Sequence, residues 1–151
     1  MSEVLSNTPE KDLYYVAVKL LLRDGQKLLI THYIFGDWDL PGGRIRKDEF
    51  NSPLESVIER KINEELGEAA TFELGSPAVF FKVERQEHDL NGQTVRIFGI
   101  GYNAQYKGGE IRLGEHHDKM EWVDIETFRP EDYFKGGWLA GVQEYIARLR
   151  T

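Results

Sequence analysis

The sequence of 151 residues contains no cysteine. This absence excludes disulfide bonds, thiolate zinc sites, iron–sulfur ligation and cysteine nucleophiles, so any metal must be held by oxygen or imidazole ligands. No apolar run approaches the roughly 18 residues that cross a bilayer, and residues 1–10 lack the apolar stretch of a signal peptide. We therefore expect a cytoplasmic protein with no membrane partner.

The sequence has fewer basic than acidic residues, 19 Lys and Arg against 26 Asp and Glu, which gives a net charge of −7. This balance argues against an extended nucleic-acid surface, although a local basic cluster could hold a small anion. The composition, 40% hydrophobic and 30% charged, is typical of a globular protein. The length predicts one domain, and we expect a loose leader over residues 1–12 and a single domain over residues 13–151.

The hydrophobic pattern predicts strands interrupted by two helices. The expected strands lie at 14–22, 27–34, 72–86, 93–105 and 120–123, with a turn at Asn91-Gly92; the helices lie at 53–66 and 138–149, and residues 36–51 form a loop. Ser52 has the position of an N-cap in a capping box, and Gly67 that of a helix stop. Such an order predicts an α/β fold with layers of helix and sheet.

One acidic residue breaks the pattern of the helix predicted at 53–66. Glu65 falls inside the apolar stripe of this helix, about 40° around the axis from Lys61. A buried isolated carboxylate costs several kcal/mol, so Glu65 needs a cation nearby. Two explanations remain open, an ordinary i,i+4 pair with Lys61 or a metal ion.

A glycine pair lies upstream of this helix. The Gly42-Gly43 turn can bring a bare backbone carbonyl beside the carboxylates of Glu64 and Glu65. Mg²⁺ prefers such an all-oxygen set and keeps several waters when it binds. The combination indicates a site that handles phosphate.

These residues resemble a known family. Gly43-x5-Glu49, Arg60, Ile62, Glu64-Glu65 and Gly67 are similar to the Nudix box, G-x5-E-x7-R-E-U-x-E-E-x-G-U with U aliphatic. The resemblance implies an α/β/α sandwich with a mixed β-sheet. It also implies a hydrolase of a nucleoside diphosphate linked to another moiety, with Mg²⁺ as cofactor and Mn²⁺ as an alternative ion. Its small-molecule substrate would be a nucleotide sugar, an ADP-ribose-like compound or a nucleoside triphosphate, and a homodimer stays open.

The box departs from the family pattern at three places. Ten residues separate Glu49 from Arg60 where the pattern has seven, Lys61 replaces a glutamate, and Glu68 replaces an aliphatic residue. These departures keep an alternative open, a catalytically weakened Nudix-fold domain that binds a nucleotide or a protein partner. An acidic adaptor domain without a ligand is a weaker alternative.

The resemblance also implies roles for single residues. The Gly42 carbonyl, Glu64 and Glu65 would bind the metal, and Glu65 would act in catalysis. Arg60 is also expected among the catalytic residues. It would pair with Glu49 and hold the loop against the helix. The substrate would be bound by Arg44, Lys61 and Trp38, whereas Arg46 and Lys47 are expected on an exposed basic loop.

The missing box glutamate raises the question of a replacement. A partial resemblance to the GDP-mannose mannosyl hydrolase branch, which lacks the same glutamate, implies His116 as a metal ligand and His117 as the general base. An imidazole with a pKa near 6.5 suits proton transfer at neutral pH, and Glu115 is a rival base. Attack at phosphorus is the family's usual reaction, and attack at a sugar carbon is the variant of that branch.

Overall fold

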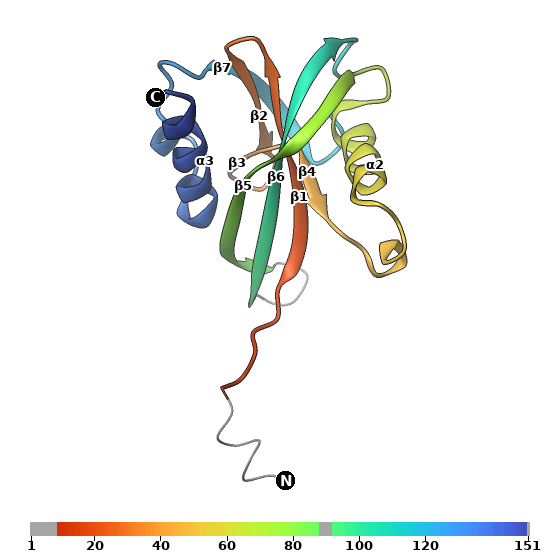
Figure 1. Cartoon of the computed structure of the whole chain (residues 1–151), viewed down its shortest axis with the longest axis vertical. Helices are drawn as coiled ribbons and strands as arrows, with labels where there is room; N and C mark the ends of the chain where they lie inside the picture. The colour runs from red at the N-terminus through yellow and green to blue at the C-terminus, as the bar shows by residue number, and fades with distance from the viewer. Residues whose placement is uncertain (1–8, 88–91, 151) are drawn as a thin grey trace.

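The computed structural model describes residues 9–87 and 92–150, which form a mixed sheet between two helices (Figure 1). The strands are β1 (Tyr15–Asp24), β2 (Lys27–Tyr33), β3 (Trp38–Asp39), β4 (Gly42–Arg44), β5 (Thr71–Glu87), β6 (Gln93–Gly108) and β7 (His117–Asp124). The helices are α2 (Leu54–Leu66) and α3 (Gly136–Leu149), with 3-10 turns η1 (Lys47–Glu49) and η3 (Pro130–Asp132).

Strand β1 lies at the centre of the sheet. The main path runs β3-β2-β1-β6-β5, and β1 pairs with β6 in parallel while the other pairs are antiparallel. β2 leaves β1 soon after the hairpin and pairs with β7 and β3, whereas β4 pairs with the first half of β1. Because β1 is covered on both faces, its sequence is a near-continuous apolar run.

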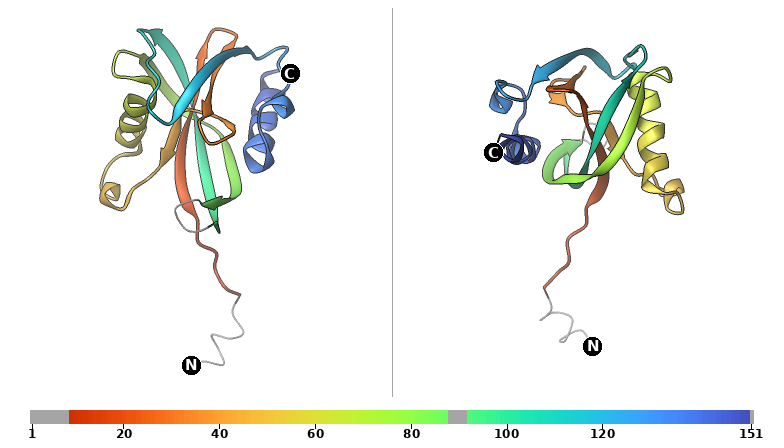
Figure 2. Two further views of the ribbon diagram at one scale, coloured as in Figure 1. Left: turned by 180° about the vertical axis from the view of Figure 1, so that it is seen from behind. Right: turned by 45° about the horizontal axis from the view of Figure 1, so that its top comes forward.

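The two helices cover opposite faces of the sheet (Figure 2). On one face Leu21 and Phe81 pack with Val142 of α3, and on the other face Leu20 packs with Ile62 of α2. Each fully buried side chain of this size contributes about 1.5–3 kcal/mol. The two cores confirm the predicted α/β/α sandwich with a mixed sheet.

Most of the predicted elements are present, and the structure differs from the prediction at three places. Ser52 does not cap α2, because the N-cap position is occupied by Pro53; the Ser52 N–H donates to the Glu49 carbonyl of the preceding turn. The helix begins one residue later than predicted, since Pro53 is extended and carries no side-chain cap. The loop predicted at 36–51 contains β3 and β4. The predicted Asn91-Gly92 turn and leader lie partly outside the described residues.

None of the helices within residues 9–87 and 92–150 has the length and apolar character of a membrane span.

Candidate active site

A cleft of about 1310 Å³ opens beside α2 and is lined by β1, β3, β4, the end of β5 and the loops before β7 and α3. All of the residues that the sequence predicts as site residues line it. They are Trp38, Gly42, Arg44, Arg60, Lys61, Glu64, Glu65, His116 and His117. The fold therefore brings together residues that are up to 79 positions apart in the sequence.

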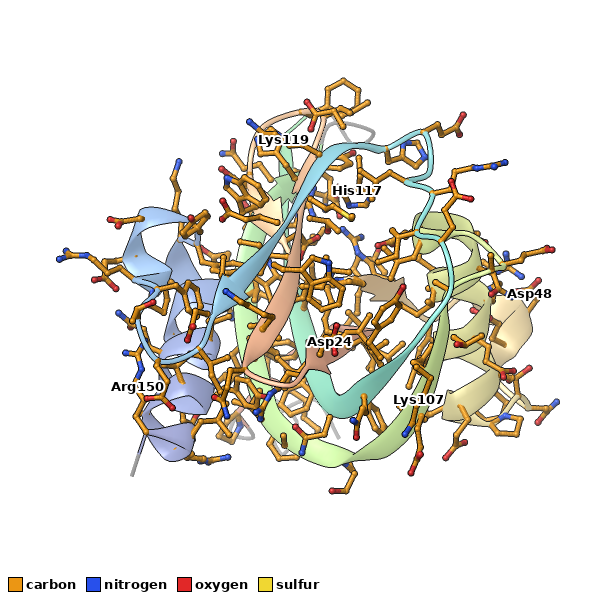
Figure 3. The ribbon with its side chains drawn as sticks, turned by 90° about the horizontal axis from the view of Figure 1, so that it is seen from above. Asp24, Asp48, Lys107, His117, Lys119 and Arg150 are labelled. Atoms are coloured by element: carbon orange, nitrogen blue, oxygen red, sulfur yellow. The ribbon has the colours of Figure 1, made fainter. Side chains whose placement is uncertain are left out.

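The loop before β7 is docked on the last turn of α2. The Gly114 N–H donates to the Glu65 carbonyl at 3.0 Å, which satisfies one of the carbonyls that a helix end leaves free. A Cβ at Gly114 would lie 2.2 Å from the Glu64 carbonyl oxygen, so this close approach requires glycine. The chain then enters β7 at His117 (Figure 3), and the His117 Nε2 lies 4.0 Å from Glu65 Oε1.

Glu65 is a buried carboxylate with few close partners. Its side chain receives a hydrogen bond from the Gly42 N–H at 3.2 Å, and the Lys61 Nζ lies 3.7 Å from Oε2. Burial raises the pKa of Glu65 to about 7, although the charge of Lys19 favours the ionised form. At neutral pH this carboxyl group can therefore hold or release a proton, and its charge is not fully compensated.

His117 is buried beside Glu65. Its ring lies edge-on to Tyr33 at 6.0 Å, and its Nδ1 has no hydrogen-bond partner among the described residues. Burial lowers the pKa of His117 below the ordinary value of an imidazole. The ring is therefore neutral at neutral pH and has a nitrogen that can accept a proton.

Glu49 and Arg60 form the ion pair that the sequence predicts. Arg60 donates from Nε and Nη2 to the two carboxylate oxygens of Glu49, at 2.7 Å each. The Arg46 N–H adds a third bond at 2.9 Å, and the Arg60 guanidinium lowers the pKa of Glu49 to about 2. Since Glu49 lies in the loop and Arg60 on α2, the pair holds the loop against the helix.

Lys61 lies between the two glutamates of α2. Its ammonium donates to Glu64 Oε2 at 3.3 Å, and Arg60 donates to the other oxygen of Glu64 at 3.1 Å. Glu64 is half exposed, and these cations lower its pKa even though burial opposes them. The Lys61 ammonium also lies 3.7 Å from Glu65 Oε2. The i,i+4 ion pair, the simpler of the two explanations for an acidic residue in the apolar face of α2, is therefore present, although the two groups are too far apart for a hydrogen bond.

Arg44 and Trp38 form walls of the cleft. The Arg44 guanidinium pairs with Glu87 and lies 5.2 Å above the ring of Tyr15. Trp38 is half-buried and packs edge-on against Tyr133 at 5.4 Å, so it belongs in part to the core below α3. Their predicted role in binding substrate stays a prediction.

The predicted metal ligands are only partly assembled. His116 is exposed and lies 3.6 Å from Glu115, and Gly42 directs its N–H to Glu65. Within the described ranges no three His, Cys, Asp or Glu side chains gather where they could hold a metal ion. The donor set therefore does not fit a metal cage made by the protein alone.

The same donor set fits a Mg²⁺ ion that is shared with a substrate. Such an ion is usually held by one or two carboxylates together with waters and phosphate oxygens. Glu64 and Glu65 would supply the carboxylates of such an ion, and the incompletely compensated charge of Glu65 favours a further cation.

Lys19 is a residue of the cleft that the sequence analysis missed. It is 5% exposed, and its ammonium donates to both carboxylate oxygens of Asp39 at 3.1 Å and to the Leu40 carbonyl at 3.2 Å. Lys19 also lies opposite Gly42 in the pairing of β1 with β4, so it ties the glycine turn to the sheet. The signal was available, because a lysine inside an apolar strand needs a buried partner.

The family model of the NUDIX domain matches residues 13–140. A MutT protein from Methanosarcina mazei Go1 has a similar structure, with TM-score 0.68 and 22% identity over 93% of this chain and 95% of that chain. An ADP-ribose pyrophosphatase from Streptococcus suis 89-1591 gives TM-score 0.64 and 14% identity over 92% and 94% of the two chains.

A UDP-X diphosphatase gives TM-score 0.64 and 13% identity, covering 99% of this chain and 70% of that chain. At these identities the structural likeness establishes the fold alone. No curated protein sequence matches the chain. The family match, by contrast, spans most of the chain and includes the box residues on α2 and in the loop before it, so the chain belongs to the NUDIX domain family, the Nudix hydrolases.

Proposed function

We propose that this Nudix hydrolase is Mg²⁺-dependent and cleaves a nucleoside diphosphate linked to another moiety. Members of the family typically hydrolyse pyrophosphate bonds in nucleoside diphosphate derivatives and generally use divalent metals such as Mg²⁺. The observation that carries the proposal is the buried Glu65 Oε1 lying 4.0 Å from the His117 Nε2, in a cleft that cations also line.

The residues of the cleft have distinct proposed roles. Glu64 and Glu65 hold the Mg²⁺ ion, and His117 accepts a proton from the attacking water. The ion held by these glutamates would neutralise the phosphate oxygens and polarise the phosphorus. Arg44 and Lys61 lie where they can contact the remaining phosphate charge.

The reaction that we propose is attack at phosphorus. The water oxygen forms a bond to phosphorus, the bond from that phosphorus to the bridging oxygen breaks, and the water proton passes to His117. Attack at a sugar carbon is the alternative that a histidine base allows. Hydrolysis in ¹⁸O water separates the two, because the label enters a phosphate product in the first case and the sugar in the second.

The names of two structural relatives support the substrate class. One is an ADP-ribose pyrophosphatase and the other a UDP-X diphosphatase, and both names describe a nucleoside diphosphate joined to a second group. Nucleotide sugars and ADP-ribose-like compounds are therefore the first substrates to test, followed by nucleoside triphosphates.

A hydrolysis screen with Mg²⁺ tests the proposal. The compounds are nucleotide sugars, dinucleotides, ADP-ribose and nucleoside triphosphates, each with and without EDTA. We expect turnover of at least one compound, abolished by EDTA. Absence of turnover from the whole set would contradict the proposal.

A binding domain without catalysis is the second candidate, and Lys61 is the residue that favours it. In that case a nucleotide would raise the melting temperature without being cleaved. A ligand at 100 times its dissociation constant stabilises the folded state by about 2.7 kcal/mol, which is easily measured.

A further inference from the structure

Lys61 is held at one place in the cleft by its surroundings. Its ammonium lies 3.3 Å from Glu64 Oε2 and 3.7 Å from Glu65 Oε2, so it bridges the two carboxylates. Its methylene groups lie against Gly43, where an added Cβ would be 2.2 Å from Lys61 Cε. The glycine therefore leaves room for the lysine side chain, and the lysine occupies the space above the glycine turn.

The neighbouring cations are committed to other partners. Arg60 is bound at two points by Glu49 and also donates to Glu64, and Lys19 donates to Asp39 and to the Leu40 carbonyl. Lys61 makes one hydrogen bond within the described part of the chain, to Glu64, and an ammonium has three N–H donors. Lys61 thus retains donors for a ligand oxygen.

We propose that Lys61 is the resident cation of the cleft, meaning that it takes the place of one divalent ion between Glu64 and Glu65 and donates to a phosphate oxygen of the substrate. The inference rests on the proposed function for the identity of that substrate. Lys61 stands where the family box has a glutamate, and in this role it removes the need for one metal ion.

The charges explain why this cation changes metal binding. When both are ionised, Glu64 and Glu65 carry −2, and the Lys61 ammonium leaves these three side chains at −1. Arg60 also donates to Glu64, but its charge is balanced by Glu49. A free divalent ion is then attracted weakly and is also repelled by the ammonium at close range. The metal consequently binds well only together with a polyphosphate, which brings its own negative oxygens. A glutamate at position 61 would instead bring the group to −3.

Titration with Mn²⁺ in the absence of any nucleotide tests this role, with the free ion followed by electron paramagnetic resonance. We expect the parent protein to bind Mn²⁺ weakly and Lys61→Glu to bind it at least about tenfold more tightly, since the local charge changes by two units. Lys61→Met keeps most of the side-chain volume and removes the charge, so it should give a smaller increase in the same direction.

Lys47→Glu is the matched control. Lys47 is exposed in η1 and does not line the cleft, and the substitution makes the same change in net charge. We expect it to bind Mn²⁺ as the parent does. If Lys47→Glu tightens Mn²⁺ binding as much as Lys61→Glu, the effect is one of overall charge and the proposal is overturned.

Two further outcomes decide the matter. Mn²⁺ affinity of Lys61→Met equal to that of the parent overturns the proposal, and this variant remains informative if Lys61→Glu does not fold. Because no nucleotide is present, the titration is independent of the hydrolysis screen. A parent protein without turnover would end the proposed function, while tighter Mn²⁺ binding by the Lys61 variants would still support the resident cation.

Discussion

Glu49 and Glu65 are two glutamates of nearly equal exposure, 7% and 8%, whose carboxyl groups behave in opposite ways. The pKa of Glu49 is lowered to about 2, because Arg60 binds both of its oxygens. The pKa of Glu65 is raised to about 7, because burial outweighs the N–H of Gly42 and the distant ammonium groups. The two side chains have similar solvent exposure, but burial has the largest effect on the pKa of Glu65, whereas the hydrogen bonds from Arg60 have the largest effect on that of Glu49.

From this comparison we propose a structural role for Glu49 and a functional role for Glu65. The charge of Glu49 is neutralised by Arg60, which binds both of its oxygens and holds the loop against α2. Glu49 does not line the cleft. Glu65 lines the cleft beside His117 and keeps an incompletely compensated charge. A perturbed pKa in a cleft is typical of groups that take part in catalysis or ligand binding.

The largest expected effect comes from making the same substitution at both positions. Glu65→Gln should lower Mg²⁺-dependent turnover by about a thousandfold, as expected for loss of a charged group at the reacting centre. Glu49→Gln should retain most of the turnover when assayed well below its melting temperature. Steady-state kinetics on both variants makes the test, and equal losses would remove the functional distinction between the two carboxylates.

The next prediction concerns His117, the neighbour of Glu65, and the pH dependence of turnover. Since the base acts when neutral, turnover should fall as the pH drops through the pKa of His117, which burial places below the ordinary 6.5. His117→Ala should reduce turnover by about a hundredfold and flatten this acid limb. A pH profile of kcat makes the measurement.

His32→Ala is the control for this prediction. His32 pairs with Asp118 at 2.8 Å and does not line the cleft, so its variant should keep the acid limb of the parent. An unchanged limb in His117→Ala would assign the base to another group, with Glu115 the next to test.

The smallest expected effect is on stability, and it has opposite signs at the two glutamates. The raised pKa of Glu65 means that its contribution to stability is full below about pH 4.5 and is lost as the pH rises to about 7. Glu65→Gln should therefore be more stable than the parent at pH 8, by at most on the order of 3 kcal/mol, and equal to it near pH 4.

At Glu49 the change of stability with pH has the opposite sign. Its lowered pKa stabilises the fold above about pH 4.5, and this contribution is lost as the pH falls toward 2. Glu49→Gln should be less stable than the parent at pH 7, and the two should converge in acid. Thermal unfolding across this pH range measures both variants, and shifts of the same sign would contradict the assigned partners.

The sequence predicts the part of the site that is local. Arg60, Glu64 and Glu65 lie on one helix, and helical spacing places them together without knowledge of the rest of the fold. The Glu49 contact was also foreseen, through the family pattern. The hairpin of β1 and β2 follows from its strand-forming runs and the turn at Gly25.

The remainder depends on contacts between distant segments. β3 and β4 are too short to give a periodic signal and exist because they pair with β2 and β1. The docking of Gly114 on the end of α2, which brings His117 to Glu65, leaves no local pattern in the sequence. Ser52 shows the reverse case, in which a good local capping signal fails because the helix begins at Leu54 and Pro53 takes the N-cap position.

The two carboxyl groups can be observed directly. Carbon-detected NMR titration of the metal-free protein would resolve the side-chain carboxyl signals of Glu49 and Glu65. We predict that Glu65 titrates near pH 7 and that Glu49 is still ionised at pH 4. Titration of both groups near the ordinary glutamate value of about 4.3 would contradict the division into a structural and a functional carboxylate.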